Sequence, residues 1–157
     1  MSSTKPLIQP PRFVTSEVDL DAAAAHTIAA AMREVAECDG EHPREVELID
    51  QFESQVPGER GAVDLSSLNT TEHKEVFLKS LVLVAFADGR VTDQERAVID
   101  RYADALQIDA DTRTRAWTDV ASSLLSVFSG IQNYRSQVVL LGESMGLDRA
   151  TIDRILG

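Results

Sequence analysis

The sequence contains little cysteine and no long apolar run, and each shortage excludes a class of protein. Among its 157 residues Cys38 is the single cysteine, so no intrachain disulfide can form and nothing indicates an oxidising compartment. No apolar run approaches the roughly 18 to 20 residues that a membrane-spanning helix needs. Residues 1–17 contain three prolines and lack the apolar segment of a secretory signal. We therefore expect a cytoplasmic protein without direct membrane insertion, attached to the inner membrane, if at all, through partners.

Basic residues are also scarce, with 15 Lys and Arg against 26 Asp and Glu, which gives a formal net charge of −11. Nucleic acid and anionic membrane surfaces would repel such a chain, whereas cations and basic protein surfaces would attract it. The acids are concentrated in residues 34–59, where Arg44 is the one basic residue. The acids of that segment are Glu34, Glu37, Asp39, Glu41, Glu45, Glu47, Asp50, Glu53 and Glu59. We expect protein partners with a basic surface and no nucleic-acid partner.

Catalytic motifs are missing as well. The sequence has no recognisable nucleophile motif, no Gly-rich phosphate loop and no zinc-type CxxC or HExxH pattern. A lone Cys38 is more typical of a small buried hydrophobic residue than of a metal or redox ligand. The histidines are scattered, and Trp117 and Tyr134 are interpreted as packing residues. We therefore expect no enzymatic activity.

The clearest pattern is in residues 76–106, VFLKSLVLVAFADGRVTDQERAVIDRYADAL. The apolar residues 81–87 fit a buried strand or a buried helix, and the charged residues before them, with Gly89 after them, favour the helix. A helix that is apolar on all sides is typical of the middle of a bundle. Thr92 and Glu95 have the spacing of a capping box, which starts a second, amphipathic helix. The stretch predicts a helical hairpin with an Asp-Gly corner.

An earlier copy of this hairpin precedes it. VAECDG at 35–40 matches VAFADG at 84–89, and after a one-residue gap Glu45 corresponds to Glu95. Two such hairpins can pack as a pseudo-symmetric pair, because each covers the apolar face that the other cannot bury alone. The expected tail is 1–17, and further helices are expected at about 18–38, 43–56, 109–128, 133–145 and up to 155. The fold predicted is an all-α single-domain bundle of about seven helices, built on two pseudo-repeated helix-DG-helix hairpins.

The residues ADGRVTDQERAVIDRYADALQID, together with the ECDG copy and the apolar helix, resemble the TerB-like family associated with bacterial tellurite resistance. The resemblance covers roughly residues 18–157, which we take as a TerB-like helical domain behind the N-terminal tail at 1–17. It implies an all-α bundle and a stress-response or envelope-associated accessory protein rather than an enzyme. It also implies that the acids of the two corners could bind a cation.

The acids at the two corners are Asp39, Glu45, Asp88 and Glu95. Carboxylates suit calcium, magnesium or manganese, and two corners with two acids each could supply four oxygens to one divalent cation. Against this, Asp-Gly is a common turn pair, and the capping box already explains Glu95. A shared site requires Asp39 and Asp88 to lie within a few ångströms of each other.

Two functions of different classes stay open. One is an accessory protein whose corners bind a divalent cation, and the other is a metal-independent helical adaptor whose acidic surface at 34–59 docks a basic partner. The sequence does not decide between a monomer and a homodimer.

Overall fold

The computed structural model describes residues 8–11, 14, 18–38, 40, 43–59, 61–87, 91–126, 139–140, 142–143 and 146–156. Over these residues the chain forms six α-helices and one 3-10 helix. They are α1 (Ala22–Glu37), α2 (Pro43–Glu53), η1 (Leu65–Ser67), α3 (Thr71–Phe86), α4 (Asp93–Ala105), α5 (Ala110–Ser126) and α7 (Arg149–Leu156). No strand forms in the described part, so the predicted all-α single domain is confirmed. The helix expected at 133–145 is described only at 139–140 and 142–143, which are helical.

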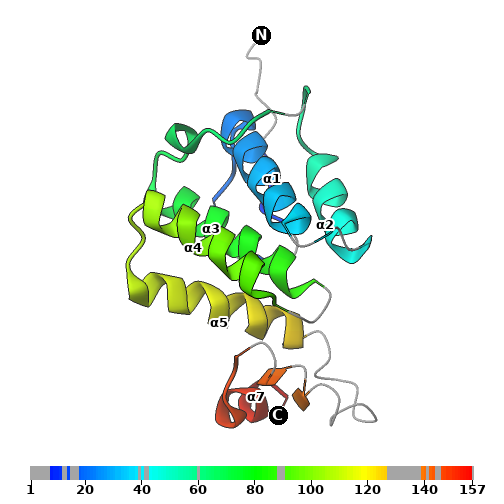
Figure 1. Ribbon diagram of the computed structural model, residues 1–157, viewed down its shortest axis with the longest axis vertical. Coiled ribbons are helices and arrows are strands. Elements are labelled where there is room, and N and C mark those ends of the chain that lie inside the picture. The colour runs from blue at the N-terminus through cyan, green and yellow to red at the C-terminus, as the bar shows by residue number, and fades with distance from the viewer. Residues whose placement is uncertain are drawn as a thin grey trace.

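The predicted central helix, α3, lies in the middle of the molecule. It packs against α1, α2, α4 and α5, and Figure 1 shows it behind α4, with α1 and α2 on one side and α5 on the other. Every residue from Val76 to Phe86 is buried except Lys79, which pairs with Asp119 of α5 at 3.3 Å. No helix within the described ranges is long and apolar enough to cross a membrane.

Side-chain caps fix where the helices begin. Asp21 caps α1 by accepting a hydrogen bond from the Ala24 amide at 2.8 Å, so α1 starts at Ala22 rather than at residue 18 as predicted. Just before it, Leu20 forms an antiparallel bridge with Ile8. Ile8 is 1% exposed, so this residue of the predicted N-terminal tail lies against the bundle.

The second helix ends earlier than predicted. It stops at Glu53 instead of Val56, and the amides of Gln55 and Val56 bond carbonyls three residues back, which tightens the chain into turns. Pro57 then has no N–H with which to continue the helical ladder. The described residues between that point and η1, 57–59 and 61–64, form neither helix nor strand, which is typical of a segment with Pro and Gly.

The capping box of α4 is present. The Thr92 hydroxyl accepts from the Glu95 amide at 3.1 Å, and Glu95 Oε1 accepts from the Thr92 amide at 2.9 Å. Substitution of Thr92→Ala removes the acceptor for one amide and is expected to lower the free energy of unfolding by about 1 kcal/mol. Urea unfolding measures this difference. Thr92→Ser keeps the hydroxyl and should lose less than half as much; an equal loss in both variants would contradict the capping role.

Candidate functional site: acidic corners and a groove on α1

The structure places two of the four predicted corner acids at the same position of two helices. Glu45 is the third residue of α2 and Glu95 is the third residue of α4, and their exposed fractions are 1% and 2%. Asp39 and Asp88 lie outside the described residues. Each of these aspartates follows the last residue of α1 or α3 by two positions in the sequence.

Burial is the feature of these glutamates that the sequence did not reveal. A buried carboxylate is unfavourable unless hydrogen bonds, an ion pair or a metal compensate for its lost hydration. For Glu95, Oε1 accepts hydrogen bonds from the amide and, at 3.2 Å, from the hydroxyl of Thr92. Within the described ranges no group of three or more His, Cys, Asp or Glu side chains could hold a metal ion. With Asp39 and Asp88 outside those ranges, the four-acid cation site stays a prediction.

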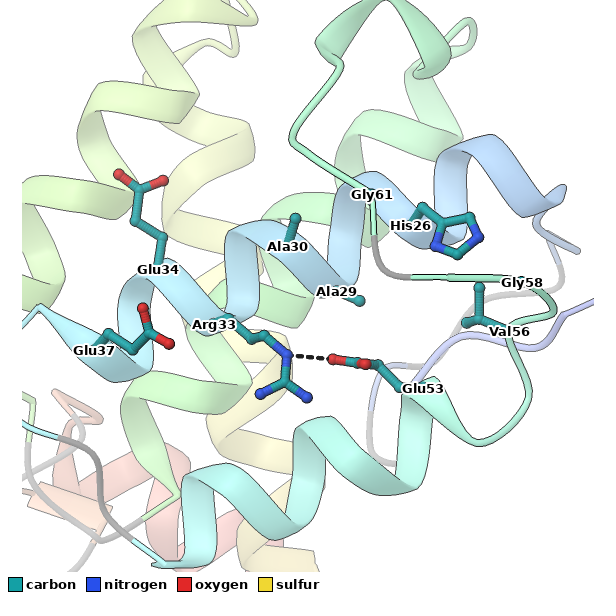
Figure 2. Close-up of a pocket in the computed structure, with 10 residues that line it drawn as sticks. All are labelled: His26, Ala29, Ala30, Arg33, Glu34, Glu37, Glu53, Val56, Gly58 and Gly61. Carbon is teal, nitrogen blue, oxygen red and sulfur yellow. Dashed lines mark hydrogen bonds and ion pairs between the residues drawn. The ribbon is translucent and has the colours of Figure 1, made fainter.

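A groove runs along the outer face of α1 and is walled by α2 and the loop after it (Figure 2). Its volume is about 310 Å³. We call it the α1 groove and define it by the residues that line it: His26, Ala29, Ala30, Arg33, Glu34, Glu37, Glu53, Val56, Gly58 and Gly61. The opposite face of α1 packs on α3. The groove therefore lies on the side of α1 that the bundle leaves uncovered.

Arg33 joins two walls of the α1 groove. Its guanidinium donates to Glu53 at 2.5 Å and to Asp50 at 3.1 Å, which ties α1 to α2. Burial opposes the charge of Arg33, but the bonds to Glu53 and Asp50 outweigh burial and raise the pKa of the guanidinium. The side chains of Arg33 and Glu53 are 18% and 17% exposed. This ion pair is therefore part of the packing of the hairpin, not a solvent-exposed contact.

A second polar cluster ties α1 to α4. Glu34 accepts hydrogen bonds from Arg101 and from the hydroxyl of Tyr102. Burial of Tyr102, followed by its hydrogen bond to Glu34 and the negative charge of that carboxylate, raises the pKa of the tyrosine hydroxyl to about 12. Tyr102 also packs edge-to-face on Phe77 of α3, with ring centroids 5.4 Å apart. The hydroxyl thus stays protonated at neutral pH and acts as a structural hydrogen-bond donor.

The family of the chain follows from a sequence comparison that agrees with this architecture. A family model described as tellurite resistance protein TerB matches residues 12–118. The chain belongs to the TerB family. No curated protein and no solved structure matches the chain. The TerB match includes both hairpins, α1 with α2 and α3 with α4, and ends within α5, so α7 lies beyond it.

The remaining candidate side chains of this TerB-family protein that the structure describes make hydrogen bonds or packing contacts within the fold. Cys38, expected to be buried, is only half-buried, and its thiol donates to the Val35 carbonyl at 3.0 Å. Trp117 packs edge-to-face on Phe86, as expected of a packing residue. His42 and Tyr134 lie outside the described residues. None of the described side chains in this set converges with the corner acids on a common site.

Sequence reasoning missed the α1 groove, although a signal was present. Residues 26, 30, 33 and 37 recur at the three- and four-residue spacing that puts side chains on one helical face. The sequence analysis predicted a helix at about 18–38 but assigned no role to this face of it. The structure shows that one alanine face is buried while Ala30 stays partly open to the groove.

Proposed function

We propose that this TerB-family protein is a non-catalytic accessory protein of tellurite and stress resistance, and that its two acidic corners bind a divalent cation. The ligands are Asp39, Glu45, Asp88 and Glu95, and the cation is calcium, magnesium or manganese. The observation that carries the proposal is the near-complete burial of Glu45 and Glu95 at the same position of the two repeats. Proteins keep carboxylates in such places when they are hydrogen-bonded, paired or bound to metal.

The arrangement of the helices supports one shared site. Figure 1 shows the C-terminal ends of α1 and α3 on the same side of the bundle, with the starts of α2 and α4 near them. The C-terminal end of a helix carries a partial negative charge, which attracts a cation. Acids supplied by the two corners would then add four oxygen donors of the kind that hard divalent cations prefer.

Thermal unfolding of metal-stripped protein with calcium, magnesium, manganese or zinc tests the site. A cation that binds only the folded state at 100 times its dissociation constant stabilises that state by about 2.7 kcal/mol. For a chain of this length the midpoint should rise by roughly 5 to 10 °C. Asp88→Asn is expected to abolish most of this rise.

The control is Asp100→Asn, which removes the same charge from an exposed position of α4 and should keep the full rise. Loss of the rise in both Asp88→Asn and Glu45→Gln would identify one site shared by the two corners. Loss in Asp88→Asn alone would restrict binding to the second corner. No rise with any ion at millimolar concentration would refute the cation site and leave the Asp-Gly corners as turns.

A second candidate function is a metal-independent adaptor in the cytoplasm that docks a basic protein partner. The observation in its favour is that the acidic segment remains on the surface, where Glu37, Glu47, Asp50 and Glu59 are all exposed. Exposed charges of one sign steer and select an oppositely charged partner. This function needs no cation and leaves the corners as structural turns.

A further inference from the structure

We propose that the α1 groove binds a lysine or arginine side chain from a basic segment of a partner protein. The inference deepens the adaptor function and rests on it, and it does not depend on a cation at the corners. The segment lies along the outer face of α1, and its cationic side chain extends toward Glu37 at the end of that helix. The argument uses the shape of the groove, its charge and the way its wall is held.

The shape fits an extended side chain. The floor of the groove extends along α1 from His26 to Glu37. These positions are eleven residues apart, which corresponds to about 16 Å along the helix axis. Ala29 and Ala30 keep the middle of this floor low, and Val56 supplies an apolar wall beside them. A volume of about 310 Å³ is at the lower limit of small-molecule pockets. The methylene stem of a lysine or arginine would cover the apolar middle and carry its charge to the acidic end.

The acids at that end of the groove differ in their partners. Arg33 pairs with the carboxylates of Asp50 and Glu53. Glu34 is already compensated by Arg101. Among the residues that the structure describes, the side chain of Glu37 makes neither an ion pair nor a hydrogen bond, and Glu37 lies in the last turn of α1.

An acid in this position is destabilising for an isolated helix, because the C-terminal end of the macrodipole is also negative. A cationic side chain placed beside Glu37 relieves the repulsion of its carboxylate by the helix end. A second copy of this chain is a poor occupant, because both copies carry a formal charge of −11.

The far wall of the groove is held in place by specific contacts. His26 Nε2 lies 2.9 Å from the carbonyl oxygen of Pro57, which ties the loop to α1. Gly58 has a φ of +89°, a conformation that a residue with a side chain rarely adopts. A Cβ on Gly61 would lie 3.5 Å from His26 Cβ, in ordinary contact. The groove is therefore formed before a partner arrives, which reduces the ordering that binding requires.

The test is the fluorescence anisotropy of a short fluorescein-labelled peptide of alternating glycine and lysine, titrated with protein at low ionic strength. Ala30→Gln fills the middle of the groove without a change of charge and is expected to weaken binding about 10-fold, which is about 1.4 kcal/mol. Glu37→Gln removes the uncompensated acid and should weaken binding about 3-fold. Glu47→Gln removes the same charge from an exposed position outside the groove and should leave binding unchanged.

The outcomes separate the two proposals. If the peptide binds wild type and Ala30→Gln equally, the groove is not the site, while an acidic docking face elsewhere survives. If Glu47→Gln weakens binding as much as Glu37→Gln, the attraction is general and the groove proposal fails. If wild type does not bind at concentrations of about 1 mM, the groove and the adaptor function both fail. Thermal unfolding of each variant confirms that it is folded, and glutamine at position 30 is compatible with the helix.

Discussion

Phe77→Ala is expected to lower the free energy of unfolding by about 4 kcal/mol, the largest effect of any single substitution considered for this chain. Phe77 is 0% exposed in the middle of α3, and its ring packs against Tyr102 of α4 at an interplanar angle of 79°. The substitution removes a buried ring, its edge-to-face contact and the packing between two helices, and it leaves a cavity. Urea unfolding followed by circular dichroism measures the loss.

Leu140→Ala provides the control. Leu140 is the large hydrophobic side chain that remains exposed in the described part of the chain, at 65%. Its truncation should change the free energy of unfolding by less than about 0.5 kcal/mol. A loss below about 2 kcal/mol for Phe77→Ala would contradict a tightly packed interface between α3 and α4, because it would mean that the site collapses around the missing ring.

Local patterns were sufficient to predict the helices and several of their starts. The apolar run of α3 and the capping box at Thr92 each depend on residues within a few positions of one another. Such short-range chemistry can be read directly from the chain. Predicted helix boundaries were less accurate where a contact with another segment sets them. The helix α1 starts at Ala22, later than predicted, because Leu20 pairs with Ile8 of the N-terminal segment.

The same contrast between features set by local sequence and features set by tertiary contacts applies to the candidate sites. The repeat predicted that Glu45 and Glu95 correspond, and their equal place in α2 and α4 agrees with that prediction. Burial of these carboxylates could not be predicted, because it depends on how the two hairpins pack on each other. The α1 groove was missed for a related reason: its floor comes from α1 and its walls come from α2 and the loop after it. Only tertiary structure brings Arg33 to Asp50 and Glu53.

Substitution of Arg33→Met is expected to lower the free energy of unfolding by about 2 kcal/mol. Methionine keeps the stem and the packing volume but removes the guanidinium, so Asp50 and Glu53 lose their common donor. Hydrogen bonds to charged groups contribute about 1.5 to 3 kcal/mol. Loss of the partner costs more for a carboxylate as little exposed as Glu53 than for a surface acid, because water hydrates it less. Urea unfolding measures the loss, and the double variant Arg33→Met with Glu53→Met should recover about half of it.

Arg101→Met is the matched comparison, because it removes a guanidinium from the ion pair between α4 and α1. The side chains of Arg101 and Glu34 are 60% and 39% exposed, so water already screens their attraction. The expected loss is at most about 1 kcal/mol, since exposed ion pairs contribute little. If both substitutions cost the same, burial does not strengthen the pair at Arg33. The α1–α2 hairpin would then be held by its apolar contacts. The charged side chains of the groove would have no role in folding and would be available to a partner.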